Sequence, residues 1–171
     1  MPIRSWLLAF SLILLAACGV GGATSIFGVT RADEPLPTLA GPTLSGDHLD
    51  AAAYAAGDVL VINVWSVNCG PCRKEQPLLV DLAERYAGEG VRFLGINYQN
   101  DLDAARGWVK EYAVPYPSLY DRSGKTAATL GYPALPDTYV VDPGGTIRWV
   151  VYGETDEREL RGLIEEVLTL A

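Results

Sequence analysis

The chain has 171 residues, 49% of them hydrophobic and 20% charged, which is enough for one globular domain with a buried core. Its formal net charge of −8 argues against a nucleic-acid partner, because binding phosphates needs a basic surface. The composition indicates no repeat, no long low-complexity tract and no second domain.

The first 17 residues have the pattern of a signal peptide. Arg4 provides a positive start, and Trp6 to Ala17 is an apolar run too short to span a bilayer comfortably. The run ends in two alanines followed by Cys18, which resembles a bacterial lipoprotein signal whose cysteine is lipidated. The alternative is an ordinary secretory signal cut nearby, with Cys18 lost or incidental. We predict a lipid anchor at Cys18 and a tether over residues 18–34.

A folded domain is expected over residues 35–171. It begins with a hairpin within 35–49 and a helical turn over 51–56. Residues 58–65 form a β-branched, nearly continuous apolar run, which is typical of a central strand covered on both faces. Residues 70–86 have the apolar spacing of a helix.

The second half of the domain continues the alternation of strands and helices. Its predicted strands are 91–97, 118–120, 138–141 and 146–152, and its predicted helices are 101–112, 125–130 and 156–170. A four-residue turn, 142–145, joins the last two strands into an antiparallel hairpin. This order predicts an α/β fold with helices on both faces of a mixed sheet.

Cys69 and Cys72 are spaced C-x-x-C between the buried strand and the following helix. The unpaired amides and the dipole at a helix N-terminus stabilise negative charge, so we expect Cys69 to ionise readily. Only the thiolate attacks disulfides, and Cys72 would then resolve the mixed disulfide. Pro71 has a backbone angle suited to the first helical turn. The pair predicts thiol–disulfide exchange, with no bound cofactor.

Two structural explanations of the cysteine pair are weaker. A disulfide across two intervening residues removes little chain entropy, so it stabilises the fold poorly. A structural zinc site needs four ligands, and the domain offers only these two sulfurs and His48, which we interpret as a surface residue. We therefore expect no metal.

The segment from Val61 to Pro77, which includes Cys-Gly-Pro-Cys, resembles the active-site segment of thioredoxin-like proteins. It looks closest to the extracytoplasmic branch that includes TlpA, ResA and the cytochrome c maturation protein CcmG. Residues 95–100 and 135–142 resemble the same branch, and the helix at 101–112 matches its helical insertion. The likeness covers residues 35–170 and implies the thioredoxin-like fold with an N-terminal β-hairpin.

The resemblance implies a role for several residues. Cys69 matches the attacking cysteine, Cys72 the resolving one, and Pro136 a cis-proline facing the disulfide; the alternative is a trans proline that starts the strand. Glu75 matches a glutamate near the cysteines that would move the proton of Cys72, unless it is merely a solvated helix residue. The predicted substrate contacts surround these groups: Trp65, Asn68, Gly70, Pro71, Leu135, Pro136 and Asp137.

The sequence departs from the family pattern at several positions. Asn63 replaces the buried aspartate of thioredoxin and cannot act as a base, so the task shifts to Glu75 or water. Asn68 stands where a tryptophan is usual, and Asp137 where many relatives have threonine or glutamate. A charged Asp137 would disfavour the Cys69 thiolate. Trp65 is interpreted as either a packing residue or a substrate contact.

Several functions remain open. The first is a membrane-anchored extracytoplasmic reductase of protein thiols, such as those of apocytochrome c, supplied with electrons by a transmembrane thiol carrier. The second is an oxidase that forms disulfides in exported proteins. A non-catalytic binding module is a third reading, which the intact cysteine pair disfavours. A thiol peroxidase lacks its expected motif, as Ile62 and Ser66 indicate, and a copper carrier would need a late histidine.

Overall fold

The computed structural model describes residues 28–131 and 134–170. Its main sheet contains β1 (Gly28–Pro35), β4 (Val59–Trp65), β5 (Val91–Tyr98), β6 (Ser118–Asp121), β7 (Asp137–Val141) and β8 (Thr146–Tyr152). The strand order is β1-β8-β7-β4-β5-β6. The pairs β4–β5 and β5–β6 are parallel and the other three are antiparallel, so the predicted mixed sheet is confirmed. The predicted entry hairpin is also confirmed, as β2 (Ala40–Pro42) paired with β3 (His48–Asp50).

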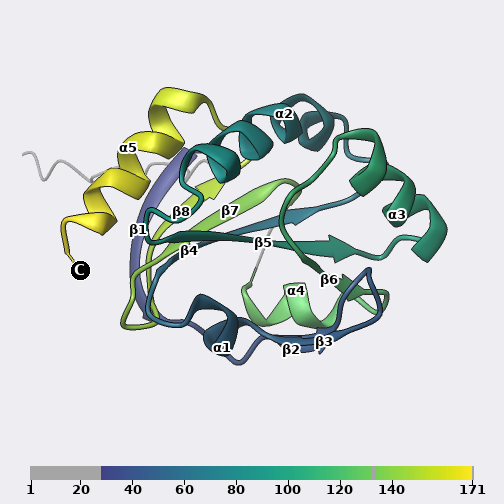
Figure 1. Cartoon of the computed structure of the whole chain (residues 1–171), viewed down its shortest axis with the longest axis horizontal. Helices are drawn as coiled ribbons and strands as arrows, with labels where there is room; N and C mark the ends of the chain where they lie inside the picture. The colour runs from purple at the N-terminus through teal and green to yellow at the C-terminus, as the bar shows by residue number, and fades with distance from the viewer. Residues whose placement is uncertain (1–27, 132–133, 171) are drawn as a thin grey trace, which may run out of the picture.

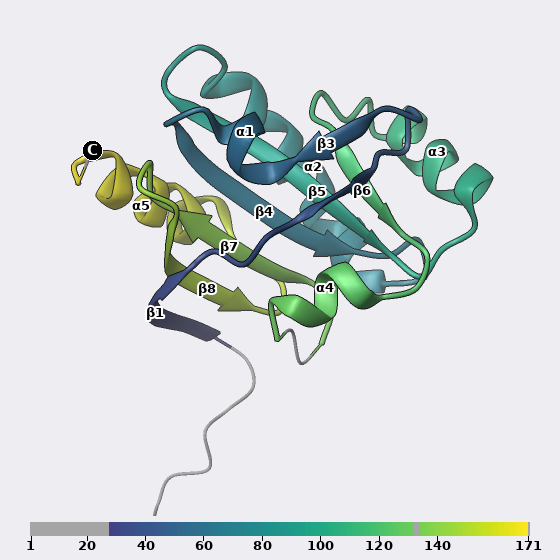
Figure 2. The same ribbon diagram turned by 90° about the horizontal axis from the view of Figure 1, so that it is seen from below.

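Five helices are described: α1 (Ala51–Ala55), α2 (Gly70–Arg85), α3 (Leu102–Glu111), α4 (Lys125–Thr129) and α5 (Glu157–Leu168). Figure 1 shows α2 and α5 on one face of the sheet and α1 and α4 on the other. Seen from below, the hairpin β2–β3 lies on the same face as α1 and α4 (Figure 2). The three-layer α/β arrangement is that of a thioredoxin-like fold. Within the described ranges, no helix has the length and apolar character needed to cross a membrane.

Strand β4 lies at the centre of the core, and all seven of its residues are buried. Its side chains alternate between two apolar clusters, because successive residues of a strand point to opposite faces. Leu60, Ile62 and Val64 join the cluster on the side of α1 and α4, whereas Val59 and Val61 pack against the side chains of α2 and α5. The predicted strand with both faces covered is therefore confirmed.

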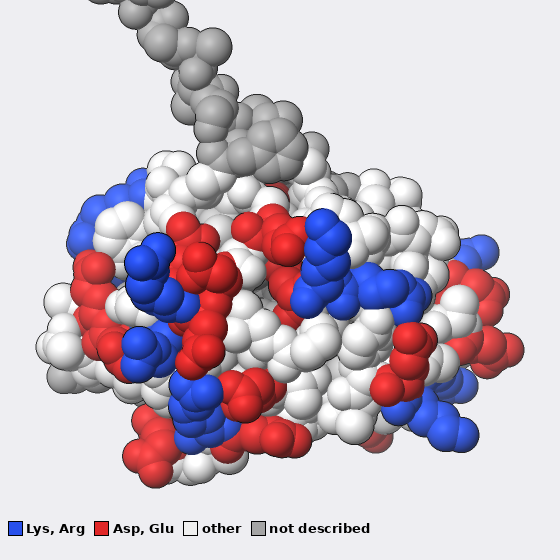
Figure 3. Space-filling model, turned by 90° about the horizontal axis from the view of Figure 1, so that it is seen from above, with Lys and Arg blue, Asp and Glu red and all other residues white. Residues whose placement is uncertain are grey.

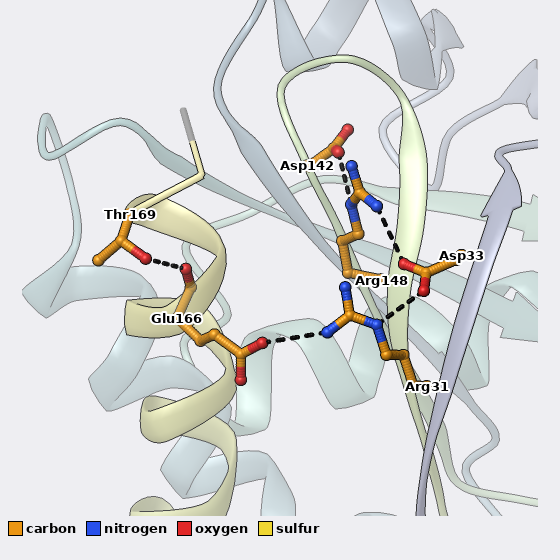
Figure 4. Close-up of polar contacts among 6 residues, drawn as sticks. All are labelled: Arg31, Asp33, Asp142, Arg148, Glu166 and Thr169. Carbon is orange, nitrogen blue, oxygen red and sulfur yellow. Dashed lines mark hydrogen bonds and ion pairs between the residues drawn. The ribbon is translucent and has the colours of Figure 1, made fainter.

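The structure corrects the last part of the predicted tether, residues 28–34, whereas residues 18–27 lie outside the described residues. Residues 28–35 form β1, which pairs with β8 at the edge of the sheet. Arg31 bonds to Asp33 at 2.7 Å and to Glu166 of α5 at 3.4 Å. Arg148 of β8 joins Asp33 to Asp142 (Figure 4). In the sequence these charges resemble those of a solvated linker, because Glu166 and Arg148, which tie Arg31 and Asp33 to the rest of the fold, lie more than a hundred residues away.

One glycine of β5 is required by close packing. A Cβ atom at Gly95 would collide with the side chain of Ser118 and lie 2.8 Å from Nε1 of Trp65. We expect Gly95→Ala to destabilise the protein by about 1–3 kcal/mol, the usual cost of overpacking a core. Gly107 in α3 is the matched control, because a Cβ there meets nothing within 4 Å and alanine favours helices. Urea unfolding checks the prediction, and it is wrong if both alanine variants unfold at the wild-type midpoint.

Candidate active site

The two cysteines form a disulfide where α2 begins. Cys69 is the N-cap of α2, its Cα lies 5.3 Å from that of Cys72, and the backbone N–H of Cys72 donates to the Cys69 sulfur at 3.1 Å. Pro71 occupies the first turn, as predicted. The same amide and the helix dipole would stabilise a thiolate on Cys69 after reduction. Cys72 is only 1% exposed, so Cys69 is the sulfur within reach of a large substrate.

An open groove of about 600 Å³ runs beside Cys69. The residues that line it are Ser66, Asn68, Cys69, Gly70, Pro71, Tyr98, Gln99, Asn100 and Leu135. Four predicted substrate contacts are among them: Asn68, Gly70, Pro71 and Leu135. Residues 95–100 belong to the family resemblance, but the sequence predicted no substrate contact in the wall over 98–100, although one signal was available. The wall is formed by the last residue of β5 and the two residues after it, and parallel strands such as β4 and β5 bring their carboxyl ends to the same edge of a sheet.

Three of the predicted substrate contacts, Trp65, Pro136 and Asp137, are buried and do not line the groove, which corrects their predicted role. Trp65 is 2% exposed and stacks on Trp108 of α3 with ring centroids 5.1 Å apart, so its side chain serves packing. Asp137 is fully buried and does not line the groove. The insertion helix α3 thus covers Trp65, and of the two roles considered for this residue the structure supports packing. The Leu135–Pro136 peptide bond is cis, as the resemblance implies, and Pro136 is buried.

Glu75 lies one turn after Cys72 and is 2% exposed, so it is no solvated helix residue. Its Oε1 accepts a hydrogen bond from Nδ2 of Asn63 at 2.9 Å, and its Oε2 accepts one from the backbone N–H of Thr155 at 3.2 Å. Burial raises the pKa of Glu75 to about 7 although both hydrogen bonds oppose the rise. A carboxyl group with this pKa can exchange a proton near neutral pH.

Asp137 is a second buried carboxyl group, directly after the cis-proline. Within residues 28–131 and 134–170, neither of its oxygens has a hydrogen-bond partner. Burial raises the pKa of Asp137 to about 7, and the nearby N–H of Gly153, which donates to the carbonyl of Pro136, opposes the rise. Two buried acids with a pKa of about 7 therefore lie near the cysteines in the chain or next to the cis-proline. Glu75 is in α2, which begins at the disulfide, and Asp137 directly follows Pro136.

The basic residues that follow Cys72 are engaged away from the sulfurs. Arg73 bonds to Glu111 at 2.8 Å, and its guanidinium lies 4.7 Å from the ring centroid of Trp108. Lys74 pairs with Glu154 at 3.5 Å. Figure 3 shows basic and acidic side chains interspersed over the face that carries α2 and α5. A Cys69 thiolate is therefore stabilised by the backbone amides and the dipole at the start of α2, and not by these basic side chains.

The groups present can perform thiol–disulfide exchange. In the described part of the chain, no three His, Cys, Asp or Glu residues gather as a metal site would need. His48 is exposed in β3, as expected of a surface residue. A redox-active cysteine pair needs an accessible sulfur and a shielded partner sulfur. Both are present here, together with a buried acid whose pKa is about 7.

A thioredoxin-like sheet with a disulfide at the start of a helix and a cis-proline defines the class of thiol–disulfide oxidoreductases. Residues 32–150 match the model of the AhpC/TSA family, and the chain belongs to that family.

Relatives and solved structures narrow this class. The chain is 37% identical over 125 residues to the thiol:disulfide interchange protein DsbE of Pseudomonas fluorescens biotype C, covering 72% of this chain and 68% of that protein. It is 26% identical over 162 residues to the thiol-disulfide oxidoreductase ResA of Bacillus thuringiensis, covering 91% and 93%. A DsbF homologue from Corynebacterium diphtheriae has a TM-score of 0.75 at 32% identity, covering 86% and 95%. The protein is thus a thiol–disulfide oxidoreductase of the DsbE/ResA type.

Proposed function

We propose that the protein is an extracytoplasmic, lipid-anchored reductase of protein disulfides, with thiols such as those of apocytochrome c as its products. The observation that carries this proposal is the Cys69–Cys72 pair at the start of α2, with the buried Glu75 one turn further on. The resemblance to ResA and CcmG supports the substrate class. A solved relative, a Mycobacterium tuberculosis oxidoreductase described as secreted, supports the location outside the cytoplasm.

The reaction has two exchange steps. The Cys69 thiolate attacks one sulfur of a substrate disulfide, and the other substrate sulfur leaves and takes up a proton. Cys72, after giving its proton to Glu75, attacks Cys69 and releases the second substrate thiol. The substrate gains two electrons and the protein is left with its Cys69–Cys72 disulfide. A membrane dithiol carrier would return it to the reduced form.

The reducing direction has a physical basis. A strongly oxidising pair has its reduced form stabilised, chiefly through the thiolate. Here Glu75 and Asp137 would oppose a nearby negative charge when ionised, and Arg73 is held against Trp108 and Glu111. The pair should therefore hold its disulfide more tightly than an oxidase does.

A redox titration of the Cys69–Cys72 pair against glutathione and dithiothreitol tests the direction. We expect a reduction potential below about −180 mV, on the reducing side of the oxidases that form disulfides. A potential nearer about −120 mV would instead assign the protein to disulfide formation in exported proteins. If the protein did not accelerate the reduction of insulin by dithiothreitol, the result would favour a non-catalytic binding module.

The anchor is tested separately, because Cys18 lies outside the described residues. Only ten residue steps separate Cys18 from the start of β1, which limits the reach to about 35 Å. The active site would therefore work close to the membrane, where a transmembrane electron carrier can meet it. We expect labelled palmitate to be incorporated, and Cys18→Ala to move the protein from the membrane fraction to the soluble one.

A further inference from the structure

Asn100 is a buried amide at the end of the groove wall, 4% exposed and directly before the N-cap of α3. Its Oδ1 accepts a hydrogen bond from the backbone N–H of Val67 at 3.0 Å. Its Nδ2 donates to the hydroxyl of Ser66 at 2.9 Å. Both partners belong to the short segment between β4 and α2, which is the segment that leads into Cys69. The two ends of this side chain therefore hold one and the same loop.

The same loop is hydrogen-bonded to the residue that carries the reactive sulfur. The backbone N–H of Cys69 donates to the carbonyl of Ser66 at 3.1 Å. With Ser66 and Val67 held by Asn100, the start of the helix is fixed to the far wall of the groove. Cys69 then remains within 3.1 Å of the backbone N–H of Cys72, the amide that stabilises its negative charge.

Asn100 is itself fixed from the opposite side. Its Oδ1 also accepts a hydrogen bond from Nδ2 of Asn97 at 2.7 Å. Its backbone carbonyl accepts from the hydroxyl of Tyr120 at 3.2 Å and from the guanidinium of Arg122 at 2.7 Å. The side-chain amide is thus anchored to β5, and the backbone of Asn100 is anchored to β6 and to the loop that follows β6. A residue held this firmly can resist displacement when a substrate enters the groove.

We propose that Asn100 is a positioning residue for the redox reaction. It holds the Ser66–Val67 segment so that Cys69 keeps its alignment with the amide of Cys72 and with the groove. The proposal rests on the function proposed above, since it concerns the reactivity of the same sulfur. Without the amide, the loop gains freedom, the Cys69 thiolate loses part of its stabilisation, and attack on a substrate slows.

The test compares Asn100→Ala with the wild type and with Asp121→Ala. Asp121 is also a buried polar residue, but its side chain bonds to Ser123 and to the N–H of Ala127. In the reduced proteins, the pKa of Cys69 is measured by thiolate absorbance and its attack rate with a small aromatic disulfide. We expect Asn100→Ala to raise the pKa of Cys69 and to slow the attack at neutral pH about tenfold, which is less than the roughly hundredfold that a misplacement of about 1 Å can cost. Asp121→Ala should lower the melting temperature and leave both values unchanged.

Ser66→Ala is the second variant, in case Asn100→Ala does not fold. It removes only the hydrogen bond to Nδ2 of Asn100, and we expect a smaller rise of the Cys69 pKa in the same direction. A loss of thermal stability with an unchanged Cys69 pKa in the Asn100 and Ser66 variants would overturn the proposal. Inactivity of the wild type towards insulin would instead count against the proposed function, because the Cys69 pKa is measured without a protein substrate.

Discussion

Replacing Cys72 by alanine is expected to stop turnover and to leave Cys69 joined to its substrate. Cys69 lines the groove, whereas Cys72 is 1% exposed and does not line it. Attack by Cys69 therefore forms the mixed disulfide, and no second sulfur remains to release it. Non-reducing gels of envelope extracts should show covalent complexes that disappear on adding dithiothreitol, and mass spectrometry identifies the partners.

Cys69→Ala is the matched control for this trap. It leaves a single shielded sulfur, so it should abolish insulin reduction without accumulating complexes. If Cys72→Ala captured nothing and Cys69→Ala did, the assignment of attacking and resolving cysteine would be reversed. Equal capture by both variants would mean that the burial of Cys72 does not protect it in the reduced protein.

Replacing Glu75 by glutamine is expected to slow the release of substrate from the mixed disulfide by about a hundredfold at neutral pH, a typical contribution of a positioned proton acceptor. The carboxyl group belongs to a buried residue of α2 and has a pKa of about 7. In the wild type the release rate should therefore rise as the pH passes through about 7 and Glu75 loses its proton. Stopped-flow measurement against pH should show this step in the wild type and not in the variant.

The same substitution changes how stability depends on pH. The folded pKa of Glu75, about 7, lies above its ordinary value of 4.5. The folded state thus binds the proton more tightly, and this stabilisation is full below pH 4.5 and lost as the pH rises through about 7. The rise is equivalent to about 3 kcal/mol at 1.36 kcal/mol per pH unit. We expect Glu75→Gln to remove the loss of folding stability that Glu75 causes between pH 5 and 8. The loss caused by Asp137 should remain.

Denaturant unfolding at several pH values measures this difference in the oxidised protein. Asp137→Asn should remove the other contribution to the slope of unfolding free energy against pH. The stability of the double variant should be nearly independent of pH in this range. If Glu75→Gln kept both the wild-type rate profile and the wild-type dependence of stability on pH, the proton of Cys72 would move to water instead of Glu75.

Local patterns predicted most of the fold. The apolar run of β4, the hairpin between β7 and β8 and the helical spacing of α2, α3 and α5 were each recognised within a residue or two of their observed bounds. Such elements are readable because burial on both faces, turn residues and helical periodicity are encoded over a few neighbouring positions. The sequence does not predict β1, because its exposed charges, Arg31 and Asp33, pair with Arg148 and Glu166 from distant parts of the chain.

The sequence by itself determined the reactive centre: two sulfurs at the start of a helix, with Pro71 in its first turn and Glu75 one turn further on. Only the tertiary structure decided the environment of that centre. It buried Glu75 between Asn63 and Thr155 and covered Trp65 with Trp108. It also removed Asp137 from solvent. The reason is physical: helix starts and turns depend on neighbouring residues, whereas desolvation and long-range hydrogen bonds depend on which distant segments meet.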